Sequence, residues 1–294
     1  MYSAYEYGGN MDEKSGIAIV TGASSGMGAA FARALARMSA GKLAIPGIPG
    51  FDELWLIARR QDRLKKLVDE LTAEHPMLTI RCFPFDLTEQ GKLLILRHEI
   101  IEDKKHVSLL INNAGFGTYG TFLSTSKDLL MKELDLNCRV PTELISIATP
   151  FMKPGSLIIN IASLAAFAPL GGFALYAATK AFMLSLSVGL ATEFREQGVL
   201  VHAFCPGPVK TEFAEIASGG LRKEVKGGWD PDKAVLYCLQ KAGKGKVISV
   251  PRFRWRFRMF LAWLFGPIAS AYFAWKFMRR PSSRDTVDDR IKPR

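Results

Sequence analysis

The sequence predicts an α/β fold in which seven strands form one doubly wound parallel sheet with helices on both faces. Seven short apolar runs are rich in β-branched residues and mostly lack polar alternation, which indicates strands buried on both faces. Segments with helical periodicity separate these runs, and the strict alternation of strand and helix predicts right-handed βαβ units. We expect strands at 16–21, 53–58, 79–83, 107–112, 156–162, 199–204 and 246–250, and helices at 27–39, 61–73, 88–103, 127–149, 176–197 and 231–242.

The chain divides into three parts. Residues 15–250 are long enough for a single domain with a full core, in which the Pro/Gly-rich stretch 41–52 is expected to be a surface excursion. Residues 1–14 carry neither a basic start nor an apolar run, so we expect a flexible N-terminus and no signal peptide. Residues 251–294 form a basic tail: eleven Lys and Arg against three Asp supply most of the net charge of +11.

The cysteine and histidine positions argue against disulfides and metal ligation. The four cysteines are far apart and form no C-x-x-C pair, so we expect reduced, small core residues and a cytoplasmic protein. The four histidines are scattered without ligand spacing, and no metal site is predicted. The cysteines are Cys82, Cys138, Cys205 and Cys238.

The first expected strand runs directly into "TGASSGMG" (21–28), and a helix follows. Gly22, Gly26 and Gly28 lie at this turn, where missing side chains let a pyrophosphate approach the backbone and the free N–H groups of the helix N-terminus. A glycine triplet alone is a weak signal, but here its strand–turn–helix context is present. We therefore expect a Rossmann-type dinucleotide site. The other residues of the turn predicted to contact the cofactor are Ser24, Ser25 and Met27.

The end of the second expected strand indicates which dinucleotide binds. An acid at this position bonds the ribose 2′-hydroxyl of NAD, whereas a base accepts the 2′-phosphate of NADP. The sequence has Arg59 and Arg60 there and no acid, which favours NADP(H), with NAD(H) as the alternative cofactor. Asp86, after the third strand, is placed to meet the adenine ring or to act as the N-cap of the next helix, and these two roles are compatible.

Further motifs fall on the same edge of the expected sheet, where ligands bind in open α/β folds. "NNAG" (112–115) ends the fourth strand, "NIAS" (160–163) the fifth and "PGPVKT" (206–211) the sixth. Tyr176 and Lys180 are four residues apart and share one helix face. With all these motifs in order, residues 15–250 resemble the short-chain dehydrogenase/reductase family, in the subgroup with T-G-x-x-x-G-x-G and Y-x-x-x-K.

The resemblance implies roles for four catalytic residues. Tyr176 is the expected general acid/base, and Lys180 is expected to lower its pKa and to hold the nicotinamide ribose. A neighbouring ammonium independently favours the phenolate form of a tyrosine. Ser163 is expected to orient the substrate carbonyl, and Asn137 to support a proton-relay water. The resemblance also implies cofactor contacts from Asn113, Ala114, Gly115, Pro206, Gly207, Val209 and Thr211, besides Tyr176 and Lys180. It further implies a homodimer or homotetramer, paired through the helices at 127–149 and 176–197.

The expected substrate is a hydrophobic carbonyl or alcohol compound, such as a steroid, a fatty 3-oxoacyl group or a bulky ketone. The loop 163–173 near Ser163 is apolar, and few charges are available to hold a charged small substrate. The resemblance implies a mobile substrate lid at residues 212–226, which follow the sixth strand, and Gly219 and Gly220 could act as its hinges. The alternative is that these apolar residues only pack the core or a subunit interface. An inactive NADP-binding regulator or a membrane-associated scaffold is the alternative function.

The tail combines seven basic residues with many aromatic ones between 251 and 281, and has no acid there. Seventeen uncharged residues separate Arg258 from Lys276, about 26 Å as one helix, but Gly266 and Pro267 should break it. Two short amphipathic segments in a membrane interface therefore fit better than a span, which suggests peripheral membrane contact through 251–280. Packing on the protein body or against another subunit is the alternative, and nucleic acid is not an expected partner.

Overall fold

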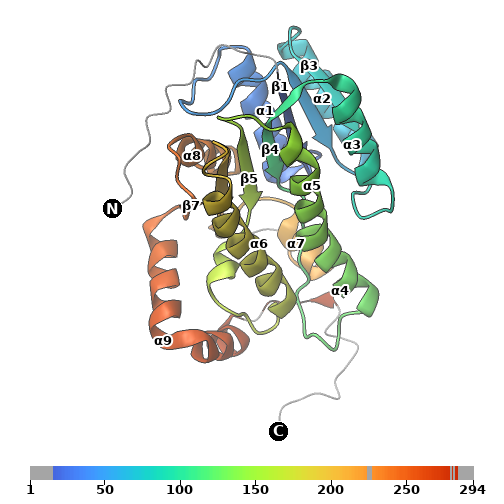
Figure 1. Cartoon of the computed structure of the whole chain (residues 1–294). Helices are drawn as coiled ribbons and strands as arrows, with labels where there is room; N and C mark the ends of the chain where they lie inside the picture. The colour runs from blue at the N-terminus through green and yellow to red at the C-terminus, as the bar shows by residue number, and fades with distance from the viewer. Residues whose placement is uncertain (1–15, 224–226, 279, 281, 284–294) are drawn as a thin grey trace.

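The computed structural model describes residues 16–223, 227–278, 280 and 282–283. The predicted flexible segment 1–14 lies outside these residues. The seven expected strands form one parallel sheet in the order β3-β2-β1-β4-β5-β6-β7 (Figure 1). Their bounds are β1 Gly16–Thr21, β2 Glu53–Ile57, β3 Thr79–Phe83, β4 His106–Asn112, β5 Leu157–Ile161, β6 Leu200–Phe204 and β7 Ile248–Ser249. The prediction of a doubly wound, seven-stranded parallel sheet is confirmed.

Burial explains why these runs form strands. Every residue of β1, β2 and β5 is buried, and so are all but the first of β4. A strand between two helical layers has no solvated face, so the sequence shows continuous apolar runs. The strand order reverses between β1 and β4, which pair through Ile19 with Leu110 and Val20 with Ile111. Ligands of such folds bind in the crevice that this reversal opens at the strands' carboxyl ends.

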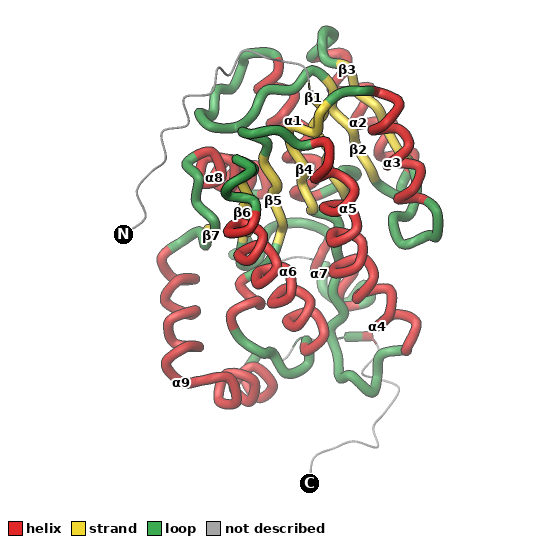
Figure 2. The backbone as a smooth tube through the Cα atoms, in the orientation of Figure 1, coloured by secondary structure: helices red, strands yellow, loops and turns green. Residues whose placement is uncertain are grey.

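Helices cover both faces of the sheet (Figure 2). The residues of α1, α2 and α8 pack into one apolar cluster with one face, and those of α3, α5 and α6 into another cluster with the opposite face. The helices span α1 Gly26–Ser39, α2 Gln61–Glu74, α3 Lys92–Asp103, α4 Lys127–Leu134, α5 Val140–Ala148, α6 Ala174–Glu193, α7 Phe213–Ser218, α8 Pro231–Gly243 and α9 Phe253–Phe277. The helix α7, in the expected lid, has no counterpart among the predicted elements.

Two predicted helices differ from those observed. The helix expected from residue 88 begins only at Lys92, because Gly91 has a left-handed backbone (φ 85°) that the preceding turn requires. Asp86 therefore does not cap this helix, and that part of the prediction is wrong. The single helix expected at 127–149 is α4, a π-helical turn at Asp135–Arg139 and α5 in succession. Such π turns occur frequently at functional sites.

The loop 41–52 runs over the surface but is anchored to the core. Gly41, Lys42, Ala44 and Pro46 are exposed, whereas Ile45, Ile48 and Phe51 are buried in the apolar cluster that contains α1 and α8. Gly47 lies so close to α8 that an added methyl group would stand 2.0 Å from the backbone oxygen of Gly243. The sequence did not predict this anchoring. Of the four cysteines, which are all free, Cys205 and Cys238 are buried as expected, whereas Cys82 is exposed.

The tail is helical but broken where the sequence predicts. Gly266 has non-helical backbone angles (φ 78°, ψ 173°), so α9 consists of two helical segments that meet there. Figure 1 shows α9 leaving β7 and then turning beneath α6. Trp255 is buried at its start against Gly207, and Trp275 packs near its end against Gly171. The tail thus packs on the body of the protein at both ends.

Candidate active site

A cleft of about 1600 Å³ opens at the carboxyl ends of the strands. All the predicted catalytic and cofactor-binding residues line it except Gly28 and Asn137. The glycine turn after β1, the end of β2, the loop after β4 and the segment 206–211 after β6 form its sides. The sequence motifs that are far apart in the chain therefore meet in one cavity, at the edge of the sheet where a ligand is expected.

The glycine turn fits the phosphates of a dinucleotide. Gly22 (φ 69°) and Gly26 (φ 53°) both have left-handed backbones that side chains strongly disfavour. Gly28 has a packing role, since a methyl group on it would lie 2.1 Å from the backbone oxygen of Gly22. The turn leads directly into α1, whose first N–H groups have no partner within the helix. This is the backbone arrangement that a pyrophosphate needs.

Thr21, the first residue of the T-G-x-x-x-G-x-G motif, has contacts that the sequence analysis did not predict, since it joins the two strands beside the cleft. Its hydroxyl donates to the backbone oxygen of Ile111 at 3.2 Å and accepts from the backbone N–H groups of Asn113 and Ala114, each at 3.0 Å. The Asn113 side chain returns a hydrogen bond to the backbone oxygen of Thr21 at 2.9 Å. These contacts fix the loop after β4 against the glycine turn.

The two arginines after β2 lie in the cleft, but each already has an acidic partner. Arg60 donates to the hydroxyls of Ser24 and Ser25, at 3.3 and 2.6 Å, and pairs with Glu212 at 2.7 Å. Arg63 also pairs with Glu212, and these two arginines lower the pKa of its carboxyl. Glu212 comes from the end of the segment after β6, 152 residues away from Arg60. Sequence reasoning missed this residue because no local motif marks it.

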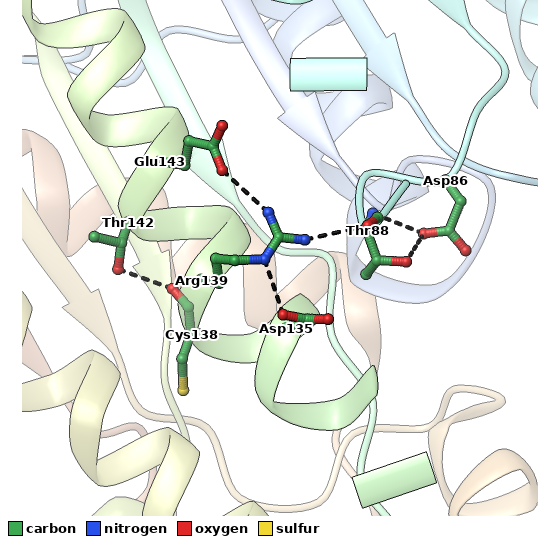
Figure 3. Close-up of polar contacts among 7 residues, drawn as sticks. All are labelled: Asp86, Thr88, Asp135, Cys138, Arg139, Thr142 and Glu143. Atoms are coloured by element: carbon green, nitrogen blue, oxygen red, sulfur yellow. Dashed lines mark hydrogen bonds and ion pairs between the residues drawn. The ribbon is translucent and has the colours of Figure 1, made fainter. Parts of the chain in front are cut away.

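Asp86 is held beside Arg59, on the same side of the cleft. The Asp86 carboxylate accepts from the backbone N–H and the hydroxyl of Thr88, at 2.9 and 2.7 Å, and lies 3.4 Å from the Arg59 guanidinium. Burial alone would raise the pKa of Asp86, but these bonds hold it below its usual value. Figure 3 shows how Arg139 of the π-helical turn donates to the backbone oxygen of Thr88, at 3.2 Å, and so braces this loop.

Ser163, Tyr176 and Lys180 come together on the opposite side of the cleft. Ser163 follows β5, and its hydroxyl accepts from the backbone N–H of Ala165 at 3.1 Å. Tyr176 and Lys180 lie in the first half of α6, and both are buried. The Lys180 ammonium donates to the backbone oxygen of Ile161 at 2.8 Å and lies 5.7 Å from the centre of the Tyr176 ring. The predicted pair is therefore adjacent in space.

Asn137 lies behind this group, in the π-helical turn. Its amide nitrogen donates to the backbone oxygen of Phe116 at 2.8 Å and to the hydroxyl of Thr179 at 3.0 Å. Its amide oxygen accepts from the backbone N–H of Phe116 at 3.1 Å. A methyl group on Gly115 would contact both the Asn137 oxygen and the Lys180 nitrogen, at 2.9 and 3.5 Å. Asn137 thus links the loop after β4 to α6 just beside Lys180.

Comparison with known proteins settles the family. Residues 16–219 match the family model described as short chain dehydrogenase. The chain belongs to the short-chain dehydrogenase/reductase family. An uncharacterized oxidoreductase of Staphylococcus haemolyticus is 30% identical over 82% of this chain and 98% of its own length. Oxidoreductase UcpA of Escherichia coli is 28% identical over 76% of this chain and 79% of its own length.

Two solved structures are similar over most of the chain. A short-chain dehydrogenase from Sphingobium yanoikuyae in complex with NADPH has a TM-score of 0.72 at 29% identity, covering 85% of this chain and 94% of that one. The bulky-bulky ketone specific alcohol dehydrogenase from Comamonas testosteroni has a TM-score of 0.69 at 28% identity, covering 85% and 93%. These findings confirm the predicted family, fold and enzyme class, an oxidoreductase acting on alcohol and carbonyl groups.

The electrostatics of this short-chain dehydrogenase differ from expectation at Tyr176. Burial raises the pKa of the Tyr176 phenol above its usual value, and a hydrogen bond with Ser163 offsets only part of that effect. Burial also lowers the pKa of Lys180 to about 8, against smaller opposing effects of Cys138, Glu133 and Cys205. The pKa of Tyr176 is thus raised by burial, whereas the sequence predicted that Lys180 would lower it. A raised pKa keeps the phenol protonated at neutral pH, which is the form that can donate a proton.

The substrate side of the cleft is apolar but not free of charge. The rings of Tyr119, Phe173 and Phe213 pack around Tyr176, with the Phe173 ring stacked on it at 4.2 Å. The second half of α9 supplies a further apolar wall that includes Phe265 and Phe273. The expectation that few charges are available is wrong, because Arg222, Arg258 and Arg280 also line the cleft. The tail brings two of them there from far along the sequence.

The pKa of Lys180 predicts the pH dependence of carbonyl reduction by this dehydrogenase. Lys180 is charged below about pH 8 and neutral above it, whereas Tyr176 keeps its proton across this range. We expect kcat/KM for NADPH to be flat near neutral pH and to fall as the pH rises through about 8, approaching about tenfold per pH unit. Steady-state rates between pH 6 and pH 10 measure this, and a profile that is flat to pH 10 would contradict it.

Proposed function

We propose that this protein is an NADP(H)-dependent oxidoreductase that interconverts a ketone and a secondary alcohol on a hydrophobic substrate. The observation that carries the proposal is the meeting of Ser163, Tyr176 and Lys180 at one side of a cleft whose other side holds the glycine turn. Such a reaction requires residues that transfer a proton and a glycine turn that binds the dinucleotide cofactor. The enzyme class of the family supports the same conclusion.

In the proposed mechanism the chain positions the substrate carbonyl and supplies its proton. The bound nicotinamide supplies or accepts the hydride. The Ser163 hydroxyl donates a hydrogen bond to the carbonyl oxygen, and Tyr176 transfers its phenolic proton to that oxygen as charge develops there. The Lys180 ammonium stabilises the phenolate that remains. Asn137 keeps the loop after β4 and the start of α6 in register, so that Lys180 stays beside Tyr176.

NADP(H) is proposed as the preferred cofactor, with NAD(H) as the alternative. Arg59 and Arg60 line the cleft after β2, where the 2′-phosphate of NADP(H) would lie, and charge-assisted bonds to phosphate are strong. Ser24 and Ser25 hold Arg60 in place. The Sphingobium structure, 29% identical to this chain, contains NADPH. In the proposed complex, the phosphate replaces part of the contact that Glu212 makes with Arg60.

The proposal is tested by NADPH consumption with a panel of bulky aromatic ketones, steroid ketones and 3-oxoacyl compounds. The Comamonas relative acts on bulky-bulky ketones, which makes these the first compounds to test. NADH and the Tyr176→Phe variant serve as controls. We expect turnover on at least one class, preference for NADPH and loss of turnover in the variant. Tight NADPH binding without turnover on any class would favour the alternative of an inactive NADP-binding regulator.

We also propose that α9 contacts a membrane peripherally, on the cytoplasmic face. Among the described residues, the helices long and apolar enough to cross a membrane are α6 and α9. However, a third of the apolar window of α6 is buried and this helix carries Tyr176, whereas only 6% of the window of α9 is buried. Trp263 is 75% exposed and Ile268 is 86% exposed, and Arg254 and Lys276 lie near the two ends of the helix. Exposed aromatic residues with flanking cations are typical of interfacial helices.

The membrane proposal predicts flotation with anionic vesicles. Purified protein should float with vesicles of phosphatidylcholine and phosphatidylglycerol at low salt, and less at high salt, because screening weakens the attraction of the arginines. Trp263→Ser with Ile268→Ser should prevent flotation while leaving the cleft intact, since neither residue lines it. The matched control is Met77→Ser, which removes an exposed apolar side chain from the other end of the protein. Equal flotation of all variants would contradict the proposal.

A homodimer or homotetramer is proposed from the family resemblance. The helices expected to pair subunits leave apolar side chains exposed, among them Met131 on α4 and Phe182 and Val188 on α6. Pairing through these helices would bury them. Light scattering coupled to size-exclusion chromatography tests this, and a monomer at micromolar concentration would reject it.

A further inference from the structure

We propose that the substrate side of the cleft binds a carboxylate through Arg280, so that the preferred substrate is an apolar oxo acid or hydroxy acid. This inference rests on the proposed function and narrows its substrate class. It comes from the placement of the tail, which carries Arg280 past the end of α9 and into the wall of the cleft.

Arg280 lies among the aromatic side chains that surround Tyr176. Its guanidinium carbon is 5.2 Å from the centre of the Phe173 ring and 5.8 Å from that of the Tyr119 ring. Phe173 is the ring that stacks on Tyr176. A single aromatic ring therefore contacts both the proton-donating tyrosine and the arginine, and an anion bound to Arg280 lies only a few bonds from the reacting carbonyl.

The Arg280 guanidinium lacks the partners that a half-buried cation normally has. Among the described residues, no acceptor lies within hydrogen-bonding distance of its Nη1 atom, which is shielded from solvent. Burial lowers the pKa of Arg280, and Arg222, a second cation, lowers it further. A buried charge without a partner is unfavourable. The binding free energy of an anion that bonds to this guanidinium is therefore larger than it would be at the protein surface.

Within the described part of the chain, no acid lines the substrate side of the cleft beside this arginine. Among the described residues that line the cleft, the acids are Asp86 and Glu212. Asp86 faces Arg59, and Glu212 is held by Arg60 and Arg63. The side chains that line the substrate side therefore include two cations, Arg222 and Arg280, and no described acid beside them, within a largely apolar cavity. That combination selects a molecule with an apolar body and one negative charge.

Thr118 provides an independent observation that points to a polar ligand in the same part of the cleft. Its hydroxyl is buried, and within the described part of the chain it has no hydrogen-bond partner. Thr118 lines the cleft and precedes Tyr119, whose ring lies against Arg280. A carboxylate has two oxygens and can accept from a guanidinium and a hydroxyl together. Arg280 is thus the main anion-binding residue, and Thr118 is available as a second donor.

The test compares acids with matched neutral compounds. Benzoylpropionate and benzoylbutyrate carry an aryl ketone a few bonds from a carboxylate, and their methyl esters lack only the charge. We expect wild type to prefer the acids, and Arg280→Gln to lower kcat/KM for the acids about ten- to a hundredfold while leaving that for the esters nearly unchanged. Arg280→Lys should recover part of the loss. Arg254→Gln is the matched control, because Arg254 is an exposed arginine of the same tail that does not line the cleft.

A second readout does not depend on turnover. Phenylbutyrate and phenylbutanol have the same apolar body without a carbonyl, and calorimetry should show that wild type binds phenylbutyrate more tightly and that Arg280→Gln abolishes this preference. The inference would be overturned if Arg280→Gln lowered kcat/KM equally for the acids and the esters. It would also be overturned if wild type bound phenylbutyrate and phenylbutanol with equal affinity. If the preference for phenylbutyrate holds but neither acids nor esters are turned over, the anion site stands and the proposed reaction fails.

Discussion

Tyr176→Phe should lower kcat for carbonyl reduction by about two to four orders of magnitude, the range typical of a positioned general acid. The substitution removes one oxygen from a ring that is held by Phe173 and Phe213, so the aromatic packing around it stays in place. Because only the proton donor is lost, the Kd for NADPH should change little. Stopped-flow measurement of a single turnover, together with NADPH fluorescence titration, separates the chemical step from cofactor binding.

Tyr119→Phe is the matched control for this substitution. Tyr119 belongs to the same aromatic cluster and is equally buried, but it lies on the loop after β4 and does not form part of the Tyr176/Lys180 pair. Its loss should leave kcat within the same order of magnitude as wild type. Comparable turnover in Tyr176→Phe and wild type would exclude Tyr176 as the proton donor.

Arg59→Ala combined with Arg60→Ala should raise KM for NADPH by about ten- to a hundredfold for each guanidinium that bonds to the phosphate, and leave KM for NADH nearly unchanged. The physical reason is that the two guanidinium groups are the cations that line the cleft at the end of β2. NADH lacks the 2′-phosphate and has no charge for them to bind. Steady-state kinetics with both cofactors on the same ketone measure the change in preference.

Arg63→Ala serves as the control for the cofactor prediction. Like Arg60 it pairs with Glu212, but it does not line the cleft. Its loss should therefore leave the ratio of the two KM values as in wild type. Glu212→Gln should act in the opposite direction and lower KM for NADPH, because it removes the carboxylate that competes with the phosphate for Arg60. Equal losses of NADPH and NADH affinity in the double variant would contradict the proposed bond to the phosphate.

The fold was predictable because its signals are local. Each buried strand is a short apolar run, and Gly22, Gly26 and Gly28 mark the turn that starts α1. The predicted break in the tail followed from Gly266, whose backbone is indeed non-helical. The differences arose where tertiary packing determines burial: Ile45, Ile48 and Phe51 anchor the loop 41–52 in the core, and Cys82 is exposed at the edge of the sheet. The sequence of a segment does not reveal which other part of the chain will pack against it.

The residues of the cleft that belong to a local sequence motif were also predictable, whereas those outside any motif were not. Residues within a motif, such as Ser163 and Tyr176, were brought together as expected. Glu212 and Arg280 were missed, because each contacts the site only through a residue distant in the chain. Glu212 meets Arg60 across 152 positions, and Arg280 meets Phe173 only after α9 has turned back beneath α6. Long-range pairing of this kind has no periodicity or spacing to reveal it.

The position of α9 also bears on how this enzyme can diversify. The helix follows the last strand of the sheet and is joined to the rest of the chain only through the segment after β7. It nevertheless builds one wall of the cleft and contacts the segment Leu164–Phe167 that follows Ser163. Evolution, or an engineer grafting a different ending after Val250, can therefore change which molecules enter without altering a single strand. The end of the chain is an exchangeable part, and the sheet with α6 is the constant one.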